Sequence, residues 1–374
     1  MKKFTAILLA ALLCLTTFAG CAQIDPGSQS AAPVESSEPV SEEVSEEVSE
    51  ESAEESAEES VASEEVVEEV PVTTEPAVYN VASLKGPTTM GMVKLMQDAE
   101  AQTTFNTYNV TMYGAADEIT AGIANGSIDI ANVPCNLAAV LYNKTKGAIS
   151  VAAVNTLGVL YVVETGETIQ SFEDLKGKTI YSTGKGTTPE FALNYLLTEN
   201  GIDPEKDVTI EYKSEAAEVA AMLAESENAV AVLPQPFVTT AMMQNDKLRI
   251  ALSFTEEWDS LQGKNGSTLV TGVTIVRNEV LEANPQAFAE FLKEYEASIA
   301  YTESNPNETA ALIANYGIVP KEPVALKALP YCNLKFLKGE EMQEKVSGYL
   351  EVLFEADPTS VGGTLPDDAF YYAE

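Results

Sequence analysis

The strongest constraint on the fold is an alternation of β-rich runs and amphipathic stretches that begins near Val78. Each of three short runs rich in β-branched and aromatic residues precedes a segment whose apolar residues have helical spacing. The pairs are 79–83 with 90–99, 109–113 with 116–125, and 128–131 with 137–143. Strands that alternate with helices pair in parallel, because each helix carries the chain back across the sheet. The pattern therefore predicts an α/β domain with a mainly parallel sheet flanked by helices.

A second copy of this plan follows at an offset of 100 residues. Residues 85–86 and 133–134 correspond to residues 185–186 and 233–234, and each pair keeps its glycine or its proline. The matched residues are common ones, so the repeat fits either a duplication or two similar α/β units. In either case, two adjacent units of one plan predict a two-lobe clamshell with a cleft between the lobes.

Two β-rich segments that begin with glycine, Gly158–Val163 and Gly272–Val276, are candidates for hinge strands that cross between the lobes. Strands buried inside one lobe would have the same composition. Helices are expected at 286–302 and 340–354. With the hinge interpretation, residues 78–163 form the first part of lobe 1, 164–270 form lobe 2, and 271–374 return to lobe 1 with the C-terminal helices.

The first twenty residues have the composition of an export signal. Lys2 and Lys3 precede an apolar stretch at 4–18, which is too short for a transmembrane helix. Small residues then lead to Cys21, an arrangement that resembles the lipobox of bacterial lipoproteins. The resemblance implies removal of residues 1–20, attachment of lipid to Cys21, and anchoring to the outer face of the cell membrane. The alternative is an ordinary signal peptide in which the cysteine is incidental.

A low-complexity segment follows the lipidation candidate and extends to residue 77. Residues 22–77 contain 18 acidic side chains and no Lys or Arg. Glutamates at helical spacing without basic partners repel one another, and few apolar groups are present to be buried. We expect residues 21–77 to be a disordered tether that holds the folded part away from the membrane.

Charge and composition exclude several classes of function. The net charge of −37 argues against nucleic acid and against anionic membrane surfaces as partners. The chain has no histidine, so Ser-His-Asp catalysis, Cys-His catalysis and histidine-ligated metal sites are ruled out. We therefore expect no enzymatic activity, no catalytic residues, no metal and no cofactor.

Five segments together resemble the type II solute-binding proteins of ABC importers, in the nitrate/sulfonate/taurine and thiamine-precursor class. The segments are 84–96, 129–142, 155–164, 171–202 and 233–239. The most specific is Asp174-Leu175-Lys176-Gly177-Lys178 before a strand and a Gly/Thr loop. The resemblance implies a monomer that captures a small polar organic or anionic solute between two lobes and delivers it to ABC permease subunits.

Two Gly/Thr loops between a strand and a helix are the first candidates for solute contact. Glycine allows backbone N–H groups to approach a ligand closely, and the N–H groups at a helix N-terminus bind anionic or polar groups. Two further loops lie after predicted strands, at the sheet edge where α/β proteins bind ligands. The candidate ligand-binding residues are Lys85, Gly86, Pro87, Thr88, Thr89, Pro134, Asn136, Asn155, Gly184, Gly186, Thr187, Thr188, Pro234 and Gln235. The alternative role for the threonines is ordinary helix capping.

The sequence is compatible with more than one role for the chain. It is either a transport protein or a surface lipoprotein with a sensing or adhesive role; an enzyme on the same fold is disfavoured by the lack of histidine.

Cys135 and Cys332 form a disulfide only if their Cα atoms lie within about 7 Å. Trp258 belongs either to a lid or to the core. The acidic balance disfavours an anionic solute, whereas helix N-termini favour one.

Overall fold

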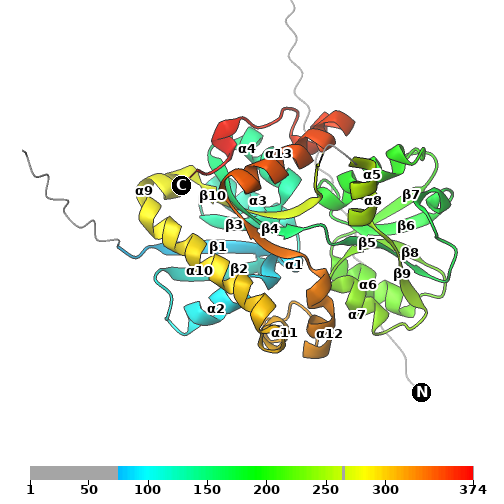
Figure 1. The fold of residues 1–374 in the computed structure, drawn as a ribbon, viewed down its shortest axis with the longest axis horizontal. Helices are drawn as coiled ribbons and strands as arrows, with labels where there is room; N and C mark the ends of the chain where they lie inside the picture. Colours follow the sequence, from blue (N-terminus) through cyan, green and yellow to red (C-terminus); the bar gives the residue numbers. More distant parts are fainter. Residues whose placement is uncertain (1–74, 263–265, 374) are drawn as a thin grey trace, which may run out of the picture. The chain divides into compact units, whose positions relative to one another are not determined.

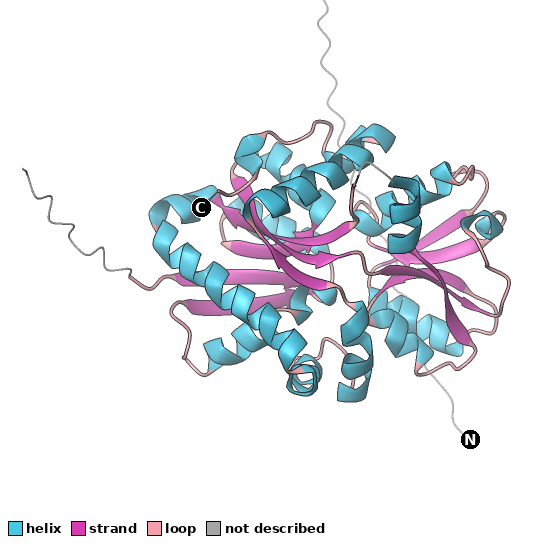
Figure 2. Cartoon of the chain, in the orientation of Figure 1, coloured by secondary structure: helices cyan, strands magenta, loops and turns pink. Residues whose placement is uncertain are grey.

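Two β-sheets, each flanked by helices, organise residues 75–262 and 266–373, which are the residues that the computed structural model describes (Figures 1 and 2). The predictions for the signal, for Cys21 and for all but the last residues of the tether lie outside these residues. Within the described ranges, no helix combines the length and the apolar character that a membrane span requires.

The first sheet has the strand order β11-β4-β10-β3-β1-β2. Its strands are β1 Val78–Leu84, β2 Thr107–Tyr113, β3 Ile130–Pro134, β4 Ile149–Leu157, β10 Val270–Arg277 and β11 Leu334–Leu337. Its helices are α1 Pro87–Met90, α2 Val93–Glu100, α3 Ala116–Asn125, α4 Cys135–Thr145, α9 Asn278–Ala283, α10 Pro285–Ser304, α11 Pro306–Asn315, α12 Glu322–Ala328 and α13 Gly339–Ala356. Short 3-10 turns follow α12 and α13, namely η2 Leu329–Tyr331, η3 Pro358–Val361 and η4 Asp368–Phe370.

The second sheet has the order β7-β6-β8-β5-β9. Its strands are β5 Leu160–Thr165, β6 Thr179–Thr183, β7 Thr209–Lys213, β8 Val230–Pro234 and β9 Leu248–Ser253. Its helices are η1 Phe172–Leu175, α5 Thr188–Glu199, α6 Ala216–Glu225, α7 Phe237–Met242 and α8 Phe254–Gln262. We refer to the two sheets with their helices as lobe 1 and lobe 2.

Both sheets are mixed, which corrects the expectation of mainly parallel sheets. Between the named strands, parallel pairing is confined to β2-β1-β3 in lobe 1 and to β7-β6-β8 in lobe 2. β10 and β5 pair antiparallel with both of their neighbours, and β11 pairs antiparallel with β4. The reason is the connectivity: β5 and β10 enter their sheets from the opposite lobe and so run against the strands of the local β-α-β units.

The chain passes between the lobes at two places. The first passage lies between the end of β4 at Leu157 and the start of β5 at Leu160, so residues 160–163 belong to lobe 2 rather than to lobe 1. The return passage follows α8 and ends at Val270, the first residue of β10, which is a strand of lobe 1. The predicted crossings are therefore made by the connections that precede β5 and β10, and each of these two strands lies within one lobe.

Local sequence explains the bounds of several elements. The run of β3 from Ile130 is buried at every position, as expected for a strand covered on both faces. α3 ends at Gly126, whose φ of 80° is the left-handed conformation that glycine adopts at helix C-termini. α10 begins at Pro285, and the Asn284 side chain accepts a hydrogen bond of 3.0 Å from the backbone N–H of Ala287.

α10 packs across one face of the first sheet (Figure 1). The ring centroid of Phe291 lies 6.5 Å from that of Tyr79 and 5.7 Å from that of Tyr108, with both pairs edge to face. Such aromatic contacts add to the stabilisation from buried apolar area. α13 and α4 lie on the opposite face of this sheet, and α13 also approaches α5 of lobe 2 (Figure 1).

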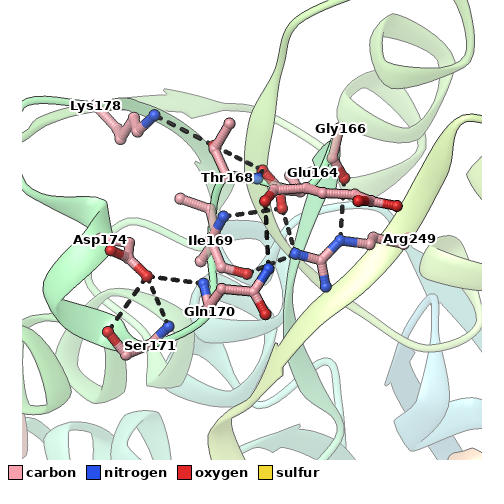
Figure 3. Close-up of polar contacts among 10 residues, drawn as sticks. Glu164, Gly166, Thr168, Ile169, Gln170, Ser171, Asp174, Lys178 and Arg249 are labelled. Carbon is pink, nitrogen blue, oxygen red and sulfur yellow. Dashed lines mark hydrogen bonds and ion pairs between the residues drawn. The ribbon is translucent and has the colours of Figure 1, made fainter.

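A buried carboxylate fixes the loop between β5 and η1 in lobe 2 (Figure 3). Glu164 is 1% exposed. Its carboxylate accepts hydrogen bonds from the backbone N–H of Thr168 at 3.1 Å, from the Thr168 hydroxyl at 2.9 Å and from the backbone N–H of Ile169 at 3.0 Å. Arg249 of β9 donates to the same carboxylate at 2.5 Å and to the carbonyls of Gly166 and Ile169. The group is therefore a structural ion pair whose polar atoms are satisfied.

The segment that most specifically suggested the family lies next to this ion pair. Asp174 accepts hydrogen bonds from the backbone N–H groups of Gln170 and Ser171 at 2.8 and 3.0 Å, and so caps η1 (Figure 3). Lys178 donates to the Thr168 hydroxyl at 3.3 Å. The acidic and basic residues of this segment thus hold a loop in place, which is a structural role.

Candidate ligand-binding site

The loops that follow β3 and β6 meet where the two lobes face each other. The Asn136 side-chain amide, in the first turn of α4, donates a 3.4 Å hydrogen bond to the carbonyl of Gly186. The Thr188 hydroxyl, at the first residue of α5, donates to the Asn136 amide oxygen at 3.3 Å. Asn136 and Thr188 are both fully buried. Two of the loops predicted from the sequence, one from each lobe, are therefore in direct contact.

The loop after β1 meets lobe 2 at a different point. A Cβ atom on Gly86 would lie 3.5 Å from the ring of Phe237, the first residue of α7. Gly86 has a φ of 148°, a conformation that L-residues rarely adopt, so this position requires glycine. Pro87 begins α1, as expected for a residue without an N–H group at a helix start. Lys85 is exposed.

The threonines of this loop are not N-caps. The hydroxyls of Thr88 and Thr89 both donate to the carbonyl of Leu84 at 2.7 Å, and the Thr89 hydroxyl also lies 2.7 Å from that of Ser83. The N-cap position of α1 is Gly86, which has no side chain to cap with. The hydroxyls instead fasten the loop to the last residue of β1.

A buried polar network centred on Asn132 supports the same loop from behind. The Asn132 amide nitrogen donates to the carbonyl of Thr88 and to the hydroxyl of Tyr295, both at 3.2 Å. Its amide oxygen accepts from Asn155 at 3.2 Å and from the Thr274 hydroxyl at 2.8 Å. Asn155 was among the predicted site residues, whereas Asn132 was missed. The signal that identifies Asn132 is a polar side chain within the apolar run of a buried strand.

In lobe 2, the Gly/Thr loop bonds largely to itself. Gly184 and Gly186 have φ values of 70° and 76°, which glycine adopts without strain. The Thr187 hydroxyl donates to the carbonyl of Gly184 at 2.7 Å, and the backbone N–H of Gly186 donates to the carboxylate of Glu190 at 2.5 Å. The exposed Lys185 ammonium lies 5.9 Å from the centroid of the Tyr212 ring.

The loop after β8 turns its polar group onto its own helix. The Gln235 amide oxygen accepts from the backbone N–H and the hydroxyl of Thr239, at 3.2 and 2.8 Å. Gln235 is 1% exposed and Pro234 is partly exposed. Of the predicted residues, the structure thus brings Asn136, Gly186 and Thr188 into one cluster across the lobes, and holds the others in neighbouring strands, loops and first helical turns.

Pro134 joins these loops to the strand that carries the network. It is the last residue of β3 and is buried. Cys135 follows it as the first residue of α4, and its side chain is buried and free. Cys332 is also free and lies in a separate apolar cluster, with its sulfur 3.7 Å from that of Met90. The disulfide considered from the sequence is absent from the structure.

Trp258 is a core residue that joins the two lobes. It lies on α8 of lobe 2 and is fully buried. Its ring centroid is 4.8 Å from that of Tyr195 on α5 and 5.4 Å from that of Tyr349 on α13. Because α13 packs on lobe 1, the contact between Trp258 and Tyr349 crosses the interface between the lobes. The only tryptophan of the chain is therefore placed to report on their separation.

The site is built from neutral polar groups and backbone. Among the residues that the structure describes, no group of three or more histidine, cysteine or acidic side chains is arranged to hold a metal ion. In the first turn of α4 there is no acidic residue, and the first turn of α5 contains only Glu190, which bonds to the Gly186 N–H group.

Comparison with known proteins agrees with this architecture. Residues 92–324 match the model of a family described as ABC transporter, phosphonate, periplasmic substrate-binding protein. Among solved structures, an ABC transporter protein from Parabacteroides distasonis is 25% identical, with a TM-score of 0.64 over 79% of this chain and 99% of that chain. Among curated proteins, none matches the sequence.

Two further structures show the fold alone. The aliphatic sulphonate binding protein SsuA from Escherichia coli is 17% identical, with a TM-score of 0.60 over 77% of this chain and 91% of that one. The nitrate-binding protein NrtA from Synechocystis PCC 6803 is 11% identical, with a TM-score of 0.57 over 77% and 84%. The predicted two-lobe α/β fold is confirmed. The predicted resemblance to substrate-binding proteins of ABC transporters is confirmed by the family model.

Proposed function

Because this chain belongs to the ABC transporter family of phosphonate periplasmic substrate-binding proteins, we propose that it captures a small organic oxyanion between its lobes and delivers it to an ABC permease. The family is one of transport proteins rather than enzymes. We extend this to the chain itself and assign it no catalytic activity, since it has no histidine with which to build the common catalytic groups.

The observation that carries the proposed solute class is the meeting of two helix N-termini. α4 has 11 residues and α5 has 12, and their first turns touch through Asn136 and Thr188. Each N-terminus carries a partial positive charge, so the two ends repel each other when nothing lies between them. An oxyanion held between the first turns would remove this repulsion and accept hydrogen bonds from both lobes.

We expect methylphosphonate, ethanesulfonate or another small oxyanion to stabilise the protein against thermal unfolding. At a concentration of 100 times its Kd, such a ligand adds about 2.7 kcal/mol to the free energy of unfolding. The same titration is expected to change the emission of Trp258, because binding alters the separation of α8 and α13. Differential scanning fluorimetry and intrinsic fluorescence measure the two effects.

The Trp258→Phe variant is the control for this experiment. It should lose the fluorescence change while still being stabilised by the oxyanion, which separates binding from the optical signal. A neutral amide of similar size serves as the second control. Stabilisation by the amide but by none of the oxyanions would contradict the proposed solute class.

We further propose that lipid on Cys21 anchors the protein to the outer face of the cell membrane. Residues 22–77 form the tether, and the protein acts as a monomer. The support is the small-residue sequence before Cys21 and the acidic, low-complexity composition after it. The Cys21→Ser variant is expected to move from the membrane fraction to the soluble extracytoplasmic fraction. Cys14→Ser, in the apolar stretch of the signal, is the matched control and should stay with the membrane. Equal membrane retention of both variants would refute the lipid anchor.

A further inference from the structure

Two buried hydroxyls from the C-terminal part of the chain lie beside the contact between α4 and α5. Tyr349 of α13 and Ser360 of η3 are both fully buried. Tyr349 lies next to Thr188 of α5, and the carbonyl of Ser360 accepts a 3.0 Å hydrogen bond from the Asn136 amide of α4. Each residue is therefore adjacent to one of the two helix N-termini that meet between the lobes.

Neither hydroxyl makes a hydrogen bond of regular geometry. Among the described residues, the Ser360 Oγ atom and the Tyr349 hydroxyl are buried polar atoms that meet no hydrogen-bond geometry, although the Tyr349 hydroxyl lies close enough to the Thr188 side chain to interact with it. A buried donor without a partner destabilises the folded state, so such groups are rare unless they serve another purpose. The neighbouring side chains of Asn136 and Thr188, by contrast, bond to each other. Beside the contact between Asn136 and Thr188, the C-terminal segment thus supplies two hydroxyls that are available to a further partner.

Both residues lie outside the part of the chain that the family model matches, which ends at residue 324. The C-terminal segment is far from the rest of the site in sequence, since the hydrogen bond between Asn136 and Ser360 joins residues 224 positions apart. The aromatic contact with Trp258, at 5.4 Å between ring centroids, holds the Tyr349 ring in place. The C-terminal segment therefore adds fixed side chains to the contact between Asn136, Gly186 and Thr188, which all lie within the matched region.

We propose that Tyr349 and Ser360 are specificity-determining residues that donate hydrogen bonds to the oxyanion of the bound solute. This inference rests on the proposed function and assigns two further donors to the same site. The solute enters by separating Asn136 from Thr188, which are in contact in this structure. Its oxygen atoms then accept hydrogen bonds from the first turns of both helices and from the two hydroxyls.

The groups around this position are compatible with an oxyanion. Burial raises the pKa of Cys135, which therefore stays a neutral thiol beside Tyr349. Burial likewise raises the pKa of Tyr349, so its hydroxyl keeps the proton that it donates. The acidic group in the first turn of α5, Glu190, bonds to the backbone of Gly186. The two hydroxyls thus supply donors without adding a formal charge.

The test compares Tyr349→Phe and Ser360→Ala with wild type, using methylphosphonate and ethanesulfonate as probes in isothermal titration calorimetry. Each variant removes one donor and keeps the shape of the side chain. We expect each to bind about tenfold more weakly to whichever probe the wild type binds, the loss of one hydrogen bond to a charged group. Without a probe, the melting temperature of each variant should be unchanged or higher by a few degrees, because an unpaired buried hydroxyl has been removed.

Two further variants make the result interpretable. Tyr295→Phe removes a buried hydroxyl that does accept a hydrogen bond, from Asn132, so its melting temperature should fall without a probe. Ser347→Ala lies on the exposed side of α13, where the hydroxyl bonds to Glu344, and should bind the probes as wild type does.

The outcomes separate this inference from the proposed function. If wild type binds a probe and both Tyr349→Phe and Ser360→Ala bind it equally well, the donor role is wrong and the proposed function stands. If both variants melt earlier by as much as Tyr295→Phe, the hydroxyls are structural and the inference is likewise overturned. If the wild type binds no probe, the proposed solute class fails, and the donor role fails with it.

Discussion

Replacement of Arg249 by methionine is expected to lower the free energy of unfolding by about 3–5 kcal/mol, the usual cost of leaving a buried charge without its partner. Glu164 is 1% exposed, and its carboxylate accepts a 2.5 Å hydrogen bond from the Arg249 guanidinium. The substitution also removes the donor to the carbonyls of Gly166 and Ile169. Since whole domains are stable by only about 5–15 kcal/mol, urea unfolding at neutral pH should detect the change clearly.

The pH dependence of unfolding gives a second measure of the same ion pair. Burial raises the pKa of Glu164, but the hydrogen bonds from Ile169, Thr168 and Arg249 outweigh burial and lower the pKa below its ordinary value. A carboxyl with a lowered folded-state pKa stabilises the protein above its unfolded-state pKa, about 4.3. That stabilisation is lost as the pH falls through the folded-state value. Wild type should therefore lose more stability on acidification than Glu164→Gln does.

The double variant Arg249→Met/Glu164→Gln is the control for both measurements. Removing the charge on Glu164 should recover part of the stability that Arg249→Met loses, because the two side chains are in contact and their effects are coupled. If Arg249→Met alone unfolds at the urea concentration of wild type, the ion pair contributes nothing and this account of the loop is wrong.

Apolar patterning predicted the strands and helices of this chain more reliably than their directions. The expected helix at 116–125 coincides with α3, and the run at 109–113 lies within β2. β10, however, is an apolar run that pairs antiparallel with β3 and β4. A buried strand has the same composition whichever way it runs, because both of its faces are covered. Direction depends on where the chain enters the sheet, which patterning does not encode.

The site could be predicted where the backbone restricts the residue type or where a polar residue follows a strand, as Asn136 follows β3. Gly86 and Gly184 have positive φ values that favour glycine, so their loops are visible in the sequence. Ser360 and Tyr349 carry no such mark, because they reach Asn136 and Thr188 through the packing of distant segments. Sequence patterns report local periodicity and backbone restriction, and contacts between segments this far apart leave no local signal.

The second large effect is expected for Asn132→Leu, which should lower the free energy of unfolding by about 3–5 kcal/mol by breaking several buried hydrogen bonds. Leucine has a similar volume but can neither donate nor accept. The carbonyl of Thr88 and the hydroxyl of Tyr295 would lose their donor, and Asn155 and Thr274 would lose an acceptor. All four side chains lie in the buried interior of lobe 1.

The same substitution should weaken solute binding, because Asn132 holds the carbonyl of Thr88 and thereby the loop that starts at Gly86. The matched control is Asn109→Leu on the edge strand β2, which removes an exposed side-chain hydrogen bond of 3.1 Å to Asn80 on β1 of the same sheet. Exposed substitutions of this kind usually change stability by less than about 0.5 kcal/mol. Urea unfolding of both variants with similar m-values would attribute the difference to the folded state. If Asn132→Leu is no less stable than Asn109→Leu, the network does not support the loop, and the Gly86 loop must be held by the bonds from Thr88 and Thr89 to Leu84 alone.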